Sequence, residues 1–158
     1  MNKPPASTPS RRACRGFSLT ELMVTLAVLS TLLTLAIAGW SSVANSMKLT
    51  ALSNTFLSQL HTARSEAIKR NASITLEQET GGWANGWSVK SGATVLLKQE
   101  AQATVSIVEE ASGASTVTYL PTGRISSGLR FEITGVGTAV RCVSVDASGI
   151  TSTKSTTC

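Results

Sequence analysis

One carboxylate, that of Glu21, lies at the entrance of a long apolar segment that follows the basic residue Arg15. An ionised carboxylate in hydrocarbon costs several kcal/mol, so a positive charge is expected close to it. Cleavage after Gly16 would create one, because the new α-amino group of Phe17 would lie four residues before Glu21. The chemistry that these residues suggest is a proteolytic cut, followed by a charge pair between the carboxylate and an amine.

The stretch Gly16-Phe17-Ser18-Leu19-Thr20-Glu21-Leu22-Met23-Val24 resembles the N-terminal signal of type IV pilins and pseudopilins. This resemblance implies that a prepilin peptidase in the membrane cuts after Gly16 and methylates the amino group of Phe17. It also implies that Glu21 sets the subunit register. In that family the glutamate docks against the N-terminal amine of a neighbouring subunit in a helical filament.

Two other interpretations of this segment stay open. Ala36-Ile37-Ala38 before Gly39 fits the cleavage rule of an ordinary secretory signal, although the apolar stretch of about 19 residues is longer than the usual signal core of roughly 7–15. The same stretch is long enough for a plain membrane anchor. Neither alternative explains Glu21. A mature N-terminus at Phe17, at Gly39 or at Met1 would separate the three interpretations.

Removal of the leader changes the charge of the protein. The formal charge of the 158 residues is +5 and falls to +1 when residues 1–16 are lost, because the leader holds Lys3, Arg11, Arg12 and Arg15. Basic residues before a membrane helix favour a cytoplasmic N-terminus. We therefore expect a leader (1–16), a transmembrane and filament-core helix (17–44) in the inner membrane, and a periplasmic domain (45–158).

The cysteines predict one disulfide. Cys14 is lost with the leader, which leaves Cys142 and Cys158 as a pair on the oxidising side of the membrane. The segment between them is rich in serine and threonine and has few apolar residues after Ile150. Such a tail is expected to need a covalent tie.

The apolar pattern predicts one long helix from Phe17 to Arg70. Beyond the membrane segment, one side of this helix is apolar at spacings of three and four residues, at Leu49, Leu52, Phe56, Leu60, Ala63 and Ala67. This stripe is expected to pack under a globular domain. Gly39 suggests a local bend or partial melting of the helix, since glycine in a helix costs about 1 kcal/mol relative to alanine.

After Asn71 the pattern predicts about seven or eight short strands separated by glycine-containing turns. The expected strands are Ser73–Leu76, Gly86–Val89, Thr94–Leu97, Thr104–Val108, Thr116–Leu120, Leu129–Ile133 and Ala139–Val145. Their connections are too short for crossover helices, so the sheet should be antiparallel. The fold class is α+β, with one long N-terminal helix on an antiparallel β-sheet domain.

A narrower resemblance concerns the end of the helix and the strands. Ala63–Asn71, Ile74–Leu76, Trp83 with Gly86-Trp87, and Leu120–Arg124 look like the GspH/FimT group of minor pilins and pseudopilins. The resemblance implies a structural subunit of a filament tip or initiation complex that associates with other pilins through the N-terminal helix. The machine served could be a type IV pilus, a type II secretion system or a DNA-uptake pilus.

The composition argues against an enzyme. His61 is the single histidine, there is no Cys-x-x-Cys pair to hold a metal, and no Gly-x-Ser-x-Gly elbow is present. Gly135-Val136-Gly137 is interpreted as a turn, and Glu109-Glu110 as a solvated loop end. No cofactor is expected.

Two further groups are assigned structural roles. Trp83 and Trp87 are expected to pack in the core near the helix end rather than to form a binding surface. Glu66 and Arg70 are spaced to pair on the helix surface.

DNA is the alternative partner, because some members of the GspH/FimT group bind DNA through a basic turn between their last strands. That turn tends to carry Gly-Arg-x-Arg, whereas this chain has Gly149-Ile150-Thr151-Ser152. The remaining candidate residues for DNA binding are Arg124, Arg130, Arg141 and Lys154. Phosphate affinity grows with the number of basic contacts, and these four are spread over about 30 residues.

Overall fold

The computed structural model describes residues 16–102 and 104–158, with the exception of the side chains at 35–39, 41 and 42. The leader residues up to Arg15, with their basic side chains and Cys14, lie outside the described residues. The chain divides into two compact units, Met1–Gly39, described from Gly16 onward, and Trp40–Cys158. We call the second of these the folded unit.

One helix, α1 (Leu19–Arg70), has 52 residues and matches the predicted helix except for its first two positions. Its backbone stays helical through Gly39, so the partial melting suggested by this glycine is not observed. The helix ends at Arg70, and the next residue, Asn71, has a left-handed φ of 49°. The Asn71 N–H donates to the Ile68 carbonyl at 3.3 Å and the Ala72 N–H to the Ala67 carbonyl at 3.2 Å. This pair of hydrogen bonds is a Schellman cap.

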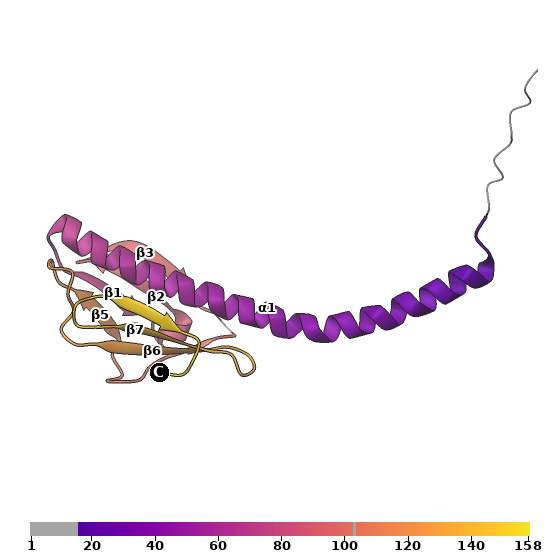
Figure 1. Ribbon diagram of the computed structural model, residues 1–158. Coiled ribbons are helices and arrows are strands. Elements are labelled where there is room, and N and C mark those ends of the chain that lie inside the picture. The colour runs from indigo at the N-terminus through magenta and orange to yellow at the C-terminus, as the bar shows by residue number, and fades with distance from the viewer. Residues whose placement is uncertain (1–15, 103) are drawn as a thin grey trace, which may run out of the picture. The chain divides into compact units, whose positions relative to one another are not determined.

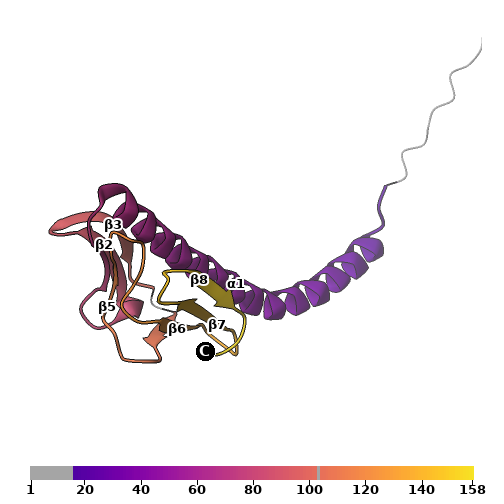
Figure 2. The same ribbon diagram turned by 60° about the vertical axis from the view of Figure 1, so that its left-hand side comes forward.

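The strands form two antiparallel sheets of four, whereas the sequence suggested one sheet. The first sheet contains, in spatial order, β3 (Thr94–Glu100), β2 (Gly86–Ser91), β1 (Ile74–Gln78) and β5 (Thr116–Tyr119). The second contains β4 (Ser106–Glu109), β6 (Leu129–Thr134), β7 (Val140–Val145) and β8 (Thr151–Lys154). In Figures 1 and 2 the second half of α1 lies along these strands.

The chain crosses from one sheet to the other more than once. After β3 it enters the second sheet as β4, which pairs with β6, and it then returns to the first sheet as β5, which pairs with β1. In these ladders Leu76 lies opposite Val117, and Ile107 lies opposite Ile133. All four of these side chains are buried. Each sheet therefore turns one apolar face to the core and one more polar face to solvent.

The apolar stripe of α1 is confirmed residue by residue. All six of its predicted members are buried in the core, namely Leu49, Leu52, Phe56, Leu60, Ala63 and Ala67. The ring of Phe56 is central, because it meets the rings of Trp83, Trp87 and Phe131 edge-on.

Both tryptophans have the core role expected for them. Trp83 lies in a short 3₁₀ helix, η1 (Trp83–Asn85), and its indole N–H donates to the Ala114 carbonyl at 3.0 Å. The indole N–H of Trp87 donates to Gln59 Oε1 of α1 at 2.7 Å. The polar atom of each buried ring is therefore satisfied.

Candidate processing and assembly site

The N-terminus of α1 begins with a capping serine. Ser18 precedes the first helical residue, and its Oγ accepts a hydrogen bond from the Glu21 N–H at 3.2 Å. The Leu22 N–H donates to the Ser18 carbonyl, also at 3.2 Å. Ser-x-x-Glu is the sequence of a capping box, so Ser18 and Glu21 occupy the first and last positions of that motif. This cap was not predicted from the sequence.

The capping arrangement gives Glu21 a local environment of its own. It is the acidic residue of the first helical turn, where the unpaired N–H groups and the helix dipole favour a negative charge. The helix therefore holds a carboxylate at its start without any partner subunit. The favourable interaction of a carboxylate with the helix N-terminus is worth about 0.3–1 kcal/mol at an exposed site. This is less than the cost of placing the charge in hydrocarbon.

The bond between Gly16 and Phe17 lies in a short segment before α1. Residues 16–18 have no regular secondary structure and are exposed, and the side chain of Phe17 is 77% exposed. Apart from its chain neighbours, none of the residues that the structure describes lies within 4 Å of the place where a β-carbon on Gly16 would be. Exposed, irregular backbone of this kind is the preferred site of proteolytic cleavage.

The first half of α1 has an apolar surface on all sides. Its exposed large apolar side chains are Leu19, Leu22, Met23, Val24, Leu26, Val28, Leu29, Leu32 and Leu33. Four of its hydroxyl groups, on Thr25, Ser30, Thr31 and Thr34, donate to carbonyls of the same helix, as Thr31 does to Val28 at 2.8 Å. A helix that is apolar all round is suited to a lipid or protein environment.

Glu21 is the only charged residue from Phe17 to Met47. Among the residues that the structure describes, no helix is both long enough and apolar enough to cross a membrane.

The structure does not gather the four basic residues proposed for DNA binding. Arg141 lies opposite Ile133 in the ladder and donates from Nη2 to Thr50 Oγ1 of α1 at 3.1 Å, so it is used to attach the helix. Arg130 and Lys154 lie on the outer face of the second sheet, on strands separated by β7. Arg124 lies in the loop between β5 and β6.

The last turn also differs from the expectation. Residues 146–150 form the turn between β7 and β8, with the Asp146 N–H donating to the Ile150 carbonyl at 3.0 Å, while Thr151 and Ser152 already belong to β8.

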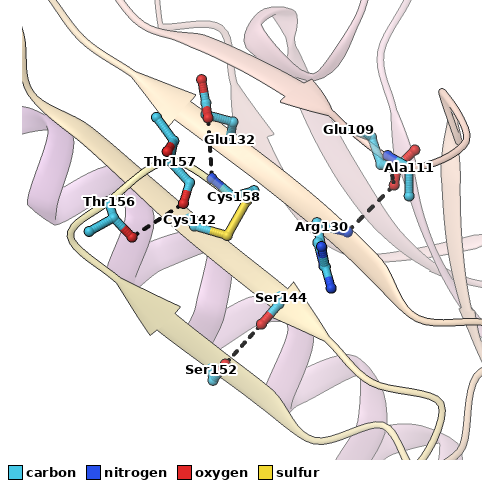
Figure 3. Close-up of a disulfide and its surroundings, with 10 residues drawn as sticks. All are labelled: Glu109, Ala111, Arg130, Glu132, Cys142, Ser144, Ser152, Thr156, Thr157 and Cys158. Carbon is cyan, nitrogen blue, oxygen red and sulfur yellow. Dashed lines mark hydrogen bonds between the residues drawn. A yellow bond between two sulfur atoms is a disulfide. The ribbon is translucent and has the colours of Figure 1, made fainter.

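The predicted disulfide is formed between Cys142 of β7 and the last residue, Cys158. Figure 3 shows the tail after β8 returning across the outer face of the second sheet. The Cys158 N–H donates to Glu132 Oε2 on β6 at 3.3 Å. The tail is exposed from Ser152 onward, so the disulfide supplies the covalent tie that its composition called for.

We expect replacement of both Cys142 and Cys158 with serine to lower the free energy of unfolding by about 2 kcal/mol. A loop of about 15 residues is worth about 3 kcal/mol in the chain-entropy model, and the β7–β8 ladder, which remains in the variant, should reduce that figure. Urea unfolding with and without a thiol reductant measures the effect. An unfolding midpoint of the wild type that does not respond to the reductant would contradict this expectation.

Comparisons with known proteins agree with these features. Residues 52–149 match the family described as Type II transport protein GspH. The chain belongs to the GspH family. Residues 11–37 also match the prokaryotic N-terminal methylation motif. This GspH-family chain is therefore a minor type IV pilin or pseudopilin, a class of structural subunits.

Solved structures show the same fold. The minor pilin FimU of Pseudomonas aeruginosa, in one crystal form, is 24% identical with a TM-score of 0.61, over 68% of this chain and 88% of FimU. In a second crystal form the values are 21% and 0.59, over 66% and 91%. No curated protein is significantly similar to the chain in sequence.

Proposed function

We propose that this GspH-family subunit is cut after Gly16 by a prepilin peptidase, methylated at Phe17 and assembled into the tip or initiation complex of a filament. Before assembly, residues 17–44 anchor it in the inner membrane, with the N-terminus in the cytoplasm and residues 45–158 in the periplasm. The observation that carries the proposal is the single charge of Glu21 on an otherwise apolar stretch of helix.

Glu21 is proposed to set the subunit register. Its carboxylate loses solvent when apolar helices pack side by side, and it regains a partner when it meets the α-amino group of Phe17 on a neighbouring subunit. Because an unpaired buried charge is costly, only the stagger that forms this pair is favoured.

Replacement of Glu21 with alanine is expected to leave cleavage after Gly16 intact and to reduce the amount of subunit in sheared filaments about tenfold, which corresponds to about 1.4 kcal/mol. The loss should follow from the missing charge pair. Immunoblots of the membrane and filament fractions measure both effects, since leader removal changes the size of the band.

The matched control is replacement of Ser18 with alanine. It removes the capping hydroxyl that accepts from the Glu21 N–H but keeps the carboxylate. If Glu21 acted only through the helix end, the two variants would lose filament recovery equally. Equal losses, or normal recovery of the Glu21 variant, would contradict the register role.

A role in type II secretion is a second candidate, because the matching family is described as a type II transport protein. Deletion of the gene separates the candidates. Loss of surface pili with normal secretion of exported enzymes supports a type IV pilus, and the reverse pattern supports a type II secretion pseudopilus.

A further inference from the structure

Three exposed apolar side chains belong to segments that meet where α1 ends. Ile68 of α1 is 53% exposed, Leu120 after β5 is 44% exposed and Ile150 in the β7–β8 turn is 56% exposed. A β-carbon on Gly123 would lie 2.8 Å from Cδ1 of Ile68, so Ile68 packs directly on the turn that begins at Leu120. We call these three residues the distal patch.

Arg64 holds the two turns of the distal patch in place. Its Nε donates to the Gly123 carbonyl at 3.1 Å, and its Nη2 donates to the Ser148 carbonyl at 3.2 Å. The turns also touch each other, because a β-carbon on Gly149, where φ is +79°, would collide with the Gly123 carbonyl oxygen. The patch is therefore fixed in shape before any partner arrives, which lowers the entropic cost of binding.

The net positive charge of the folded unit comes from the segments that contain the distal patch. Four basic residues lie on the same helix end and turns as the patch, namely Arg64, Lys69, Arg70 and Arg124, with two acidic residues, Glu66 and Asp146. Glu66 pairs with both Lys69 and Arg70. The rest of the folded unit has six basic and six acidic side chains. Lys69 keeps 71% of its side chain exposed even though it approaches Glu66 at 3.5 Å.

We propose that the distal patch binds the globular domain of another pilin subunit. The surface of that subunit that meets the patch would be apolar at its centre and acidic at its rim. This inference rests on the proposed assembly function and identifies a second contact, separate from the helix start at Glu21. A small apolar centre within a charged rim is the usual composition of a protein interface. Nucleic acid fits less well, because aliphatic side chains at the centre offer nothing to phosphates, which bind through basic contacts.

The test uses the full chain in its native host, with the variants Ile150→Asp and Val136→Asp. Val136 is the matched control, since it is also 56% exposed in a turn. Its neighbour Gly135 lies against Leu49 of α1, whereas Gly123, in the turn that begins at Leu120, lies against Ile68, 19 residues further along the helix. We expect the amount of the Ile150 variant in sheared filaments to fall about tenfold, because one central side chain of an interface often supplies that much affinity. The amount of the Val136 variant should stay at the wild-type level.

Normal recovery of the Ile150 variant, or an equal loss in both variants, would overturn the proposal. A second pair of variants tests the charge. Arg124→Glu should lower recovery, whereas Lys154→Glu, on the outer face of the second sheet, should not. Equal recovery in this pair would overturn the acidic partner surface.

Photo-crosslinking gives a readout that does not depend on filament formation. A photoreactive residue at position 150 should form an adduct with another pilin subunit, identified by mass spectrometry, and one at position 136 should form much less. An adduct with DNA, or none at position 150, would overturn the inference. If the wild type never enters filaments, the proposed function fails, while the adduct formed in the membrane fraction still decides the role of the patch.

Discussion

Replacing Phe56 with alanine is expected to lower the free energy of unfolding of the folded unit by about 4 kcal/mol, since loss of a buried phenylalanine costs about 3–5 kcal/mol. Phe56 is fully buried. Its ring centroid lies 4.9 Å from that of Trp87, 5.0 Å from Phe131 and 5.8 Å from Trp83. These partners belong to the first sheet, the second sheet and η1, so one side chain of α1 joins all three.

Urea unfolding followed by tryptophan fluorescence measures this effect, because two of the three partners are tryptophans. The control is Asn54→Ala, which changes an exposed residue of the same helix and should shift stability by less than about 0.5 kcal/mol. A loss below about 1 kcal/mol in the Phe56 variant would mean that the aromatic cluster does not hold α1 on the sheets.

Replacing Glu109 with glutamine is expected to cost about 3 kcal/mol at neutral pH. Burial would raise the pKa of Glu109, but hydrogen bonds from the N–H groups of Ala114, Ser112 and Ala111 lower its pKa from 4.5 to about 2. A difference of that size corresponds to about 3 kcal/mol of stability. The carboxylate thus anchors the loop that carries the chain from β4 in the second sheet to β5 in the first.

The contribution of Glu109 to stability depends on pH. A carboxyl group whose pKa is lowered by folding stabilises the protein fully above its unfolded pKa. Its contribution is lost as the pH falls from about 4.5 toward 2, through the folded pKa of about 2. The difference in stability between the wild type and the Glu109→Gln variant should therefore shrink over this range.

Urea unfolding at a series of pH values measures that difference. Glu110→Gln, at the exposed neighbouring position, is the control and should stay close to the wild type. A constant difference between pH 6 and pH 3 would contradict the role assigned to the carboxylate of Glu109.

The sequence predicted the helix far better than the sheets, for a physical reason. The stripe from Leu49 to Ala67 repeats over neighbouring turns, so its pattern is local and can be read directly. The pairing of β1 with β5 and of β4 with β6 joins segments far apart in the chain. The residues of a strand do not by themselves indicate which other strand it pairs with. The division into two sheets was therefore not predicted.

At the level of single residues, two signals were present and missed. Ser18 and Glu21 have the spacing of a capping box. Arg141 alternates with Val143 and Val145, which are buried, so it lies on their side of β7 and was a poor candidate for DNA binding. The role of Glu109 had no such signal. It depends on a loop geometry that turns several N–H groups toward one carboxylate. The expectation of a solvated loop end was wrong for Glu109, which is buried, whereas Glu110 is exposed.

We propose above all that processing creates the α-amino group with which the carboxylate of Glu21 pairs. The N-terminal sequence and mass of the protein purified from filaments or membranes of its native host test this claim most directly. We predict a chain that begins at Phe17 and carries one methyl group on its α-amino nitrogen. A chain that begins at Gly39 or Met1, or at any other residue, would contradict it.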